Sequence, residues 1–409
     1  MPRISLDGQF VDAQAGDTVA EALLRARITT FSRSIKYHRP RGPFCFSGSC
    51  GQCLMQIDGF PSQLACRVRA QEGMKCVRQN APLGADTDVL RAADFVFSGG
   101  LDHHHLLTGS KLLGRVALEV ARRLAGLGEL PQAVQPVVAG AVRKVRLAIV
   151  GGGPAGLSAA RAAGADAVLI EREDELGGAV RLGLAQAADL SAPCEVLLQA
   201  ECVGLYANDT RLPGNALLAV RLAANPNAHP AQSAVRLLVL VADNVIVANG
   251  AAPQPVPFAG VDRPGVYAAR GLLALNGRIA SRIVVVGDGE EAQACAAALR
   301  KKGYEVLREV RASSALRALG NPVKALDVDG ERVRCDAVAI AAGPSPLHEL
   351  ATSVGAQARW DSAIGGFPVQ IDAQGRTSVP WLFAAGRVAG QGGARAAESG
   401  ALAGAACRA

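Results

Sequence analysis

Residues 144–156 read KVRLAIVGGGPAG, a buried-strand run that leads directly into a glycine-rich turn. An alanine-rich stretch of helical character follows, and the next apolar run ends at Glu171, roughly twenty residues after the first glycine of the turn. The G-x-G-x-x-G pattern is weak in isolation, but here it stands between a strand and a helix and has an acid at the ribose position. This context predicts a dinucleotide-binding Rossmann unit.

The chemistry of this turn is that of a pyrophosphate site. Free N–H groups and the helix dipole favour negative charge at a helix N-terminus, and an acid at the end of the second strand accepts hydrogen bonds from ribose hydroxyls. The candidate cofactor-binding residues are Gly151, Gly153, Pro154, Ala155 and Gly156 at the turn, with Glu171 and Arg172 after the second strand. FAD and an adenine nucleotide without a flavin fit this motif equally well.

A second copy of the pattern, VVVGDGEEA, occupies residues 284–292. By position it corresponds to a nicotinamide-dinucleotide site, but Glu290 and Glu291 place two negative charges where a pyrophosphate approaches. At about 4 Å such a like-charge contact costs on the order of 1 to 4 kcal/mol. The strand at 306–310 also breaks the apolar run of a central parallel strand, and Arg311 stands where a ribose-binding acid is expected. We predict that this unit keeps its fold and has weakened or lost NAD(P).

Clustered cysteines near the beginning of the chain predict a metal centre. Five of the ten cysteines fall between residues 45 and 76, and residues 45–53 read CFSGSCGQC. The spacing C-x4-C-x2-C with one later cysteine suits a 2Fe-2S cluster, which takes three thiolates from one tight loop and a fourth from a neighbouring segment. The candidate ligands are Cys45, Cys50, Cys53 and Cys66. Zinc, which usually takes paired C-x2-C knuckles, and free thiols are the alternatives.

The residues around these cysteines indicate a small α+β domain. Residues 4–11 alternate around the turn pair Asp7-Gly8 and predict a hairpin, and Asp17 or Thr18 then caps a helix that runs to Ala26. A hairpin followed by a helix suggests a β-grasp core. Gly48 and Gly51 suit a loop whose N–H groups turn toward cluster sulfides.

Composition narrows the class of protein. The chain has 409 residues, half of them apolar and 19% charged, which excludes general disorder and allows several domains. Glycine numbers 46, whereas Phe, Trp and Tyr number 10, 2 and 4, which argues against a nucleic-acid-binding surface. No apolar run reaches the roughly 18 residues of a membrane span, and the first residues do not resemble a signal peptide. We therefore expect a soluble cytoplasmic protein.

The charge excess of +7 is unevenly distributed. Residues 1–146 hold 19 Lys and Arg against 12 Asp and Glu, whereas the remainder holds 24 of each sign. A basic surface in the first third suits an acidic partner protein or a phosphate, and a solvated basic face is the equal alternative.

These patterns predict the domain organisation. The expected fold class is α/β, with two Rossmann-like units of the FAD/NAD type, one inserted in the other, preceded by the β-grasp 2Fe-2S domain. The expected boundaries are 1–98 for the 2Fe-2S domain, 99–143 for a helical connector and linker, 144–262 and 362–409 for the FAD domain, and 263–361 for the NAD-type domain. The connector contains three adjacent histidines, residues 103–105, which cannot all face one metal from a regular element.

Residues flanking the cysteine loop resemble a known family. SIKYHRPRG at 34–42, VRAQ at 68–71 and RQNA at 78–81 are similar to the α subunits of heterotetrameric sarcosine oxidase. They are also similar to the related hydrogen cyanide synthase, opine oxidases and multisubunit proline and hydroxyproline dehydrogenases. The resemblance covers nearly the whole chain and is specific for the family, not for the substrate.

Other segments resemble two-domain flavoprotein reductases. VIVANG at 245–250 resembles the strand that returns beneath the flavin, and WLFAAG at 381–386 resembles the last strand of that fold. The resemblance adds Gly177, Gly178, Gly250, Gly386, Arg387 and Gly393 to the candidate cofactor-binding residues. One departure concerns Arg387, because that family usually places an acid there.

The combined motifs predict electron relay. A flavin exchanges electron pairs or single electrons, and a 2Fe-2S cluster carries one. The nucleotide-binding units contain no C-x2-C pair, and His229 and His348 are expected in structural roles. No catalytic residue is therefore assigned to this chain. The resemblance implies a β subunit of amino-acid-oxidase type that oxidises an amine, with FMN at the subunit contact, and an electron acceptor for the cluster. The alternatives are a self-sufficient NAD(P)H reductase and a non-enzymatic structural subunit.

Overall fold

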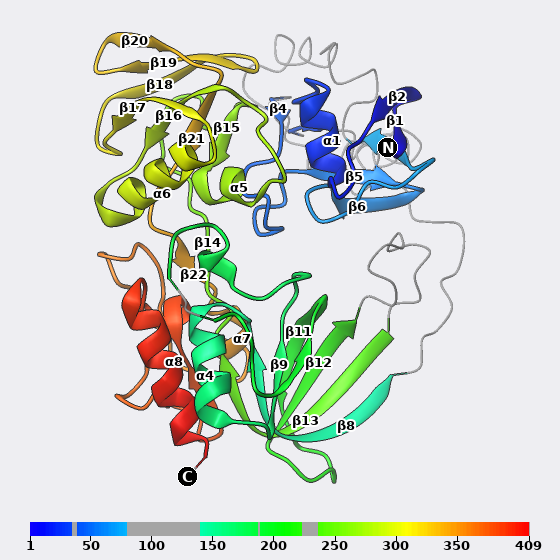
Figure 1. The fold of residues 1–409 in the computed structure, drawn as a ribbon, viewed down its shortest axis with the longest axis vertical. Coiled ribbons are helices and arrows are strands. Elements are labelled where there is room, and N and C mark those ends of the chain that lie inside the picture. The colour runs from blue at the N-terminus through cyan, green and yellow to red at the C-terminus, as the bar shows by residue number, and fades with distance from the viewer. Residues whose placement is uncertain (35–38, 80–139, 187–188, 223–235, 409) are drawn as a thin grey trace, which may run out of the picture. The chain divides into compact units, whose positions relative to one another are not determined.

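The computed structural model describes residues 1–34, 39–79, 140–186, 189–222 and 236–408. These residues form two compact units, shown in Figure 1. The first unit comprises the described parts of Met1–Gln135, Pro255–Val286 and Lys302–Ile340, and the second those of Pro136–Gln254, Gly287–Lys301 and Ala341–Ala409. Residues 99–139 of the predicted connector, with its three histidines, and His229 lie outside the described residues.

The first unit begins with the predicted β-grasp module. Its five-stranded sheet has the order β2-β1-β7-β5-β6, with β1 parallel to β7. The bounds are β1 Arg3–Leu6, β2 Gln9–Asp12, β5 Leu54–Ile57, β6 Phe60–Leu64 and β7 Lys75–Arg78, with a short pair β3 Ser32–Arg33 and β4 Pro40–Arg41 beside the cysteine loop. The predicted hairpin is confirmed, because Asp7 and Gly8 both adopt positive φ between antiparallel strands.

Helix α1, Val19–Arg25, begins where the sequence predicts. Thr18 is its N-cap: the Thr18 hydroxyl accepts a hydrogen bond from Glu21 N at 3.2 Å, and the Glu21 carboxylate accepts one from Thr18 N at 2.8 Å. This reciprocal pair satisfies two backbone donors at the helix start. Asp17, the other predicted cap, is buried and forms an ion pair with Arg25 at 3.0 Å.

We expect Thr18→Ala to lower the free energy of unfolding by about 1 kcal/mol, because the hydroxyl acceptor of the cap is lost. Urea denaturation followed by circular dichroism measures this change. Thr18→Ser is the matched control and should stay within a few tenths of a kcal/mol of the natural protein. Equal midpoints for the alanine and serine variants would contradict the cap.

The rest of the first unit holds a parallel sheet and an antiparallel meander. The parallel sheet has the order β15-β21-β16-β17, and the meander consists of β18, β19 and β20. The bounds are β15 Val266–Ala268, α5 Ala269–Ala274, β16 Arg282–Val286, β17 Glu305–Val310, β18 Leu316–Gly320, β19 Val323–Val328, β20 Glu331–Arg334 and β21 Ala337–Ile340.

One inference about this sheet is wrong. The interrupted apolar run at 306–310 predicts a defective central strand, but β17 is the edge strand of its sheet. Its residues are alternately exposed and partly buried, which is the pattern of a strand with a solvated face. The polar residues of β17 therefore say nothing against nucleotide binding.

The second unit is built on a larger mixed sheet. Its order is β10-β9-β8-β13-β12-β11, and β23 pairs with β13. The bounds are β8 Ala141–Val150, β9 Ala167–Ile170, β10 Glu195–Leu197, β11 Ala200–Ala207, β12 Ala216–Leu222, β13 Arg236–Val247 and β23 Leu382–Ala384. Strand β8 begins at Ala141, before the predicted Lys144, because its first residues pair with β13. The end of the expected connector and linker, 99–143, thus overlaps the start of this strand.

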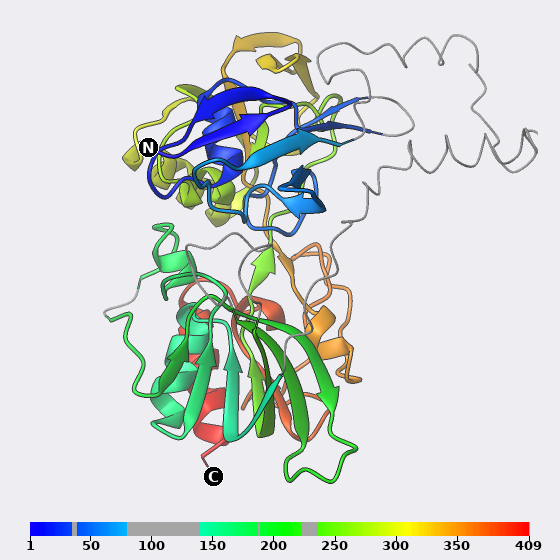
Figure 2. The same ribbon diagram turned by 90° about the vertical axis from the view of Figure 1, so that its right-hand side faces the viewer.

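Apolar cores cover both faces of this sheet, which explains the continuous apolar runs in its parallel strands. Helices α4, Pro154–Ala163, and α8, Ala394–Ala406, lie side by side on one face (Figure 2). Gly400 and Gly404 of α8 make this possible: a Cβ there would lie 2.0 Å from Ala155 O and 2.2 Å from Ala159 O. These glycines bring the two helix backbones into direct contact.

The chain leaves this sheet after β13 and returns to it as β23, parallel to β13. This return confirms the predicted insertion of one Rossmann-like unit into the other. The remaining elements of the second unit are η2 Gly178–Val180, β14 Ala251–Ala252, α6 Gly289–Lys301, β22 Ser345–Pro346, α7 Glu349–Thr352 and η3 Gly386–Ala389. Over the described residues, none of the helices combines the length and the apolar character needed to cross a bilayer.

Candidate cofactor sites

The fold brings the four predicted cluster ligands together. Cys45, Cys50 and Cys53 lie in the loop before β5, and Cys66 follows β6. The thiols of Cys50 and Cys66 lie close enough to Cys45 to shift its pKa, and Cys66 lies equally close to Cys53. Three of these cysteines are buried and Cys50 is half-buried.

The close approach of these thiols divides the four cysteines by acidity. The proximity of Cys50 and Cys66 lowers the pKa of Cys45, and the proximity of Cys66 lowers that of Cys53. The same contacts raise the pKa of Cys50 and Cys66. The four sulfurs thus form one connected set, in which Cys45 adjoins both Cys50 and Cys66, and Cys66 adjoins Cys53.

This donor set fits a 2Fe-2S cluster. Such a cluster is held by four cysteine thiolates, with a pair on each of its two irons, and the four thiols match this requirement. Over the described part of the chain, no three or more His, Cys, Asp or Glu side chains are arranged to hold a single metal ion.

The backbone of the cysteine loop has the expected shape. Gly48 and Gly51 adopt φ of +80° and +65°, which a side chain would disfavour. Ser47 N donates to Cys45 Sγ at 3.4 Å, and the nearby Gln52 backbone lowers the pKa of Cys50 in part. Such donors stabilise negative charge on sulfur. Cys76 lies apart in β7, where burial raises the pKa of its thiol to about 12.

The first glycine-rich turn joins β8 to α4, and its three motif glycines differ in their surroundings. A Cβ on Gly151, at φ +107°, would lie 2.4 Å from Ala248 O, and a Cβ on Gly156 would lie 1.7 Å from Gly151 O. A Cβ on Gly153 would meet nothing within 4 Å. The first and third glycines therefore serve the fold, and Gly153 faces open space at the N-terminus of α4, where Pro154 and Ala155 form the first turn. This cradle fits a pyrophosphate.

Glu171 lies beside this turn at the end of β9 and is 8% exposed. Its Oε2 accepts from Gly152 N at 2.7 Å, and its Oε1 accepts from Glu173 N at 2.9 Å. Two backbone donors fix the carboxylate, which retains free lone pairs for ribose hydroxyls. Arg172, the next residue, forms an ion pair with Glu173 at 3.3 Å, and its role in cofactor binding stays a prediction.

The second glycine pair lies against the first turn. Gly177 N donates to Gly152 O at 2.9 Å, and a Cβ on Gly178 would lie 3.2 Å from Gly153 Cα. The structure thus brings together two glycine-rich segments that are separated in sequence. Their close approach leaves the open side of Gly153 bordered by backbone.

A residue absent from the candidate set, Asn249, also borders this turn. Its Cα would lie 3.1 Å from a Cβ on Gly151, and its Nδ2 donates to Leu347 O at 3.0 Å. Its Oδ1 is shielded from solvent and has no hydrogen-bond partner. Such an orphaned acceptor suits a donor on a bound nucleotide. In the sequence, Asn249 could have been singled out because it is a polar residue directly after the apolar run VIVA. The adjoining Gly250 adopts φ +80° with open space beyond.

The last strand leads to the remaining candidate residues. Gly386 follows β23, and its N–H donates to Ser399 Oγ of α8 at 2.9 Å. Gly393 is the N-cap of α8, with φ +58°, and a Cβ there would meet nothing within 4 Å. Arg387, where the flavoprotein pattern has an acid, forms an ion pair with Glu291 at 2.7 Å.

One of the two acidic residues at the second glycine-rich turn is therefore paired with an arginine of the same chain. Glu291 in the first turn of α6 is engaged by Arg387, whereas Glu290 beside it is exposed. Gly287 packs against the backbone, since a Cβ there would lie 2.4 Å from Ala341 O, and Gly289 is open. The loss of NAD(P) at this turn stays a prediction. His348 is the N-cap residue of α7, without a side-chain cap hydrogen bond, and its structural role stays a prediction.

Comparison with known sequences identifies the larger part of the chain. The pattern of the pyridine nucleotide-disulphide oxidoreductases matches residues 145–326 and 313–404. The chain belongs to this family. The pattern of a 2Fe-2S iron-sulfur cluster binding domain matches residues 2–81 in addition. The oxidoreductase is therefore a flavoprotein of the FAD type that also carries a 2Fe-2S domain, and this resolves the open alternatives of zinc and of a nucleotide without flavin.

Individual relatives agree with the predicted family. The sarcosine oxidase subunit alpha of Rhizobium meliloti is 28% identical over 302 residues, which is 67% of this chain and 30% of that protein. The hydrogen cyanide synthase subunit HcnA of Pseudomonas aeruginosa is 38% identical over 72 residues, which is 18% of this chain and 68% of that protein. The predicted resemblance to these subunits is confirmed. The oxidoreductase spans 30% to 39% of the length of the sarcosine oxidase α subunits it matches.

A solved structure shares the fold. L-proline dehydrogenase from P. horikoshii superimposes with a TM-score of 0.67 at 20% identity, over 95% of this chain and 68% of that chain. At this identity the likeness concerns the fold alone. It supports the arrangement of two Rossmann-like units, one inserted in the other.

Proposed function

We propose that this chain is the electron-transferring flavoprotein and 2Fe-2S subunit of a hetero-oligomeric amine or amino-acid dehydrogenase or oxidase. The observation that carries the proposal is the gathering of four thiols in one module of a chain that also has an FAD-type nucleotide cradle. Cofactors of one-electron and two-electron capacity in one polypeptide suit electron relay.

The residues proposed to hold the cofactors follow from the geometry. Cys45, Cys50, Cys53 and Cys66 would ligate the cluster. The turn from Gly151 to Gly156, with Glu171, Gly177 and Gly178, would hold the FAD pyrophosphate and ribose, and Gly250, Gly386 and Gly393 would border its remainder. Bound FAD would supply two-electron chemistry, and the cluster single-electron transfer. The protein contributes N–H donors, positive φ turns and exclusion of side chains at these positions.

We propose that substrate oxidation takes place on a partner chain. The five cysteines of the nucleotide-binding part, Cys194, Cys202, Cys295, Cys335 and Cys407, contain no C-x2-C pair for disulfide chemistry. The family resemblance suggests a β subunit of amino-acid-oxidase type as electron donor, FMN at the subunit contact, and a separate electron acceptor. The basic first third of the chain, residues 1–146, is the candidate docking face. The domain boundaries given above remain part of this proposal.

The test is to purify the chain alone and together with a β subunit of this type. The chain alone should contain iron and FAD and should not oxidise amines, whereas the complex should reduce a dye in an amine-dependent manner. Reduction of the cluster should accompany amine oxidation and appear in the electron paramagnetic resonance spectrum. A colourless chain, or a cluster that stays oxidised while amine is consumed, would contradict the proposal.

The same preparation tests the NAD(P)H reductase alternative, which the presence of a second nucleotide-binding unit favours. Rapid bleaching of the isolated chain by NADH or NADPH would support a self-sufficient reductase. Micromolar NADH binding that is lost on substitution of the 287–291 turn would overturn the expected loss of NAD(P). A cluster inert to every reductant would instead support the structural-subunit alternative.

A further inference from the structure

Within the first compact unit, the iron-sulfur module contacts the NAD-type domain at Cys45, the first candidate cluster ligand. A Cβ on Gly271 of α5 would lie 2.7 Å from Cys45 O and 2.7 Å from the Phe46 ring. Helix α5 therefore rests directly on the main chain of the cysteine loop, and only glycine allows this approach.

The neighbouring residues hold the same three-residue segment. Ala268 N donates to Phe44 O at 2.9 Å. The ring of Phe46, a residue at φ +53°, packs on the ring of Tyr267 with centroids 5.7 Å apart. Both rings are nearly fully buried. Residues 267–271 thus fix the backbone before, at and after Cys45 by a hydrogen bond, a backbone contact and an aromatic contact.

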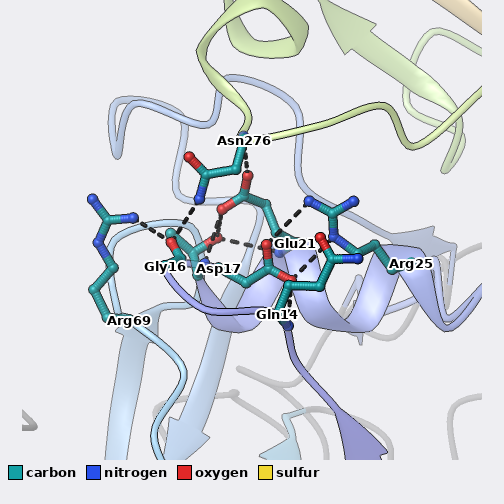
Figure 3. A network of polar contacts seen from close by, with 8 residues as sticks. Gln14, Gly16, Asp17, Glu21, Arg25, Arg69 and Asn276 are labelled. Carbon is teal, nitrogen blue, oxygen red and sulfur yellow. Dashed lines mark hydrogen bonds and ion pairs between the residues drawn. The ribbon is translucent and has the colours of Figure 1, made fainter. Parts of the chain in front are cut away.

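A polar network binds the two parts at a second place (Figure 3). Asn276 N donates to Glu21 Oε1 at 2.6 Å, and Asn276 Nδ2 donates to Gly16 O at 2.7 Å. Glu21 is 3% exposed and also accepts from the N-cap of α1. A buried carboxylate shared in this way is costly to separate from its partners, so these contacts stabilise the packing of the module against the segment around Asn276.

We propose that the NAD-type domain supports the cluster-binding loop. In this proposal Gly271 and Tyr267 are positioning residues for the backbone around Cys45. The NAD-type domain would then have a structural role that does not require NAD(P) binding. The inference rests on the proposed function, since it takes Cys45 as a cluster ligand. The direction in which cluster sulfurs and N–H groups point depends on the backbone of this loop, so its support tunes the redox potential.

The first experiment is Gly271→Ala in the full chain with its β subunit. The added methyl meets backbone atoms that cannot rotate away, so the Cys45 segment must shift. We expect a changed electron paramagnetic resonance spectrum and midpoint potential of the cluster, with unchanged FAD content. Gly343→Ala is the matched control, because a Cβ there meets nothing within 4 Å; it should leave both cofactors as in the natural protein.

Tyr267→Leu is the second variant, because it removes the ring under Phe46 without adding atoms. We expect chelators to extract iron about tenfold faster from this variant, again without loss of FAD. This variant keeps the inference testable if Gly271→Ala does not fold. Natural-protein cluster spectra, potentials and iron-release rates in these variants would overturn the inference while leaving the relay intact. A natural protein without any cluster would overturn the proposed function itself.

Discussion

Cys50→Ser is expected to abolish amine-dependent dye reduction by the complex with its β subunit and to remove the visible absorption of the cluster. A serine hydroxyl stays protonated where a thiol ionises, so the cluster loses one of its four thiolate ligands. Because even the partners of metal ligands typically account for 10- to 100-fold in metal affinity, loss of the ligand should reduce cluster occupancy by at least about 100-fold. Iron analysis, absorption spectra and steady-state dye reduction measure the result.

The matched control is Cys76→Ala. Cys76 is buried in the same module, on β7, and is not bonded to the thiols of the cysteine loop. This variant should keep its iron, its spectrum and its activity, with a stability loss typical of a small buried side chain. FAD content should be unchanged in both variants, since the nucleotide cradle lies in the other unit. Full activity and iron content in Cys50→Ser would remove Cys50 from the ligand set and count against the relay.

Gly153→Val is expected to weaken FAD binding by about 10- to 100-fold, or roughly 1.4 to 2.7 kcal/mol. Because Gly153 is the N-cap of α4, the apolar side chain should also cost about 1 kcal/mol of stability. Gly153 has an ordinary φ of −77°, and a Cβ there meets no protein atom within 4 Å. The side chain would therefore fill the space over the helix N-terminus that the pyrophosphate needs. Flavin fluorescence quenching measures the affinity, and thermal unfolding of the flavin-free chain measures stability.

Two other glycines make the result interpretable. Gly343→Val also enters open space and should alter neither stability nor FAD affinity. Gly156→Ala places its Cβ 1.7 Å from Gly151 O and should lower the unfolding temperature, because the turn and α4 must separate. If Gly153→Val binds FAD as tightly as the natural protein does, the pyrophosphate does not rest on this turn.

The parts of the fold that were predictable are those encoded in short stretches. The hairpin at Asp7-Gly8, the cap at Thr18 and the strand-turn-helix at residues 144–156 each depend on contacts within a few residues, so spacing and residue type are sufficient. The cysteine spacing likewise predicted which thiols meet. The flavoprotein resemblance predicted that the chain returns to its first sheet near residue 382.

Other features depend on residues far apart in the chain. The edge position of β17 could not be read from its own residues, because it depends on which strand lies beside it. The pairing of Glu291 with Arg387 joins positions 96 residues apart and gives both departures from the nucleotide-binding patterns a common explanation. The orphaned oxygen of Asn249 became evident only once its other amide atom was seen bonded to Leu347.

Residue order alone thus established the kinds of chemistry in this protein, iron-sulfur and dinucleotide binding, because each kind needs particular residue types at short, regular spacing. Only the tertiary structure showed which residues hold the cluster-binding loop in place. Gly271 lies more than two hundred residues beyond the cysteine loop, yet its lack of a side chain lets α5 reach Cys45 O. A glycine required by a close backbone contact looks in sequence like any other glycine. Its role depends on distance in space, which no local pattern records.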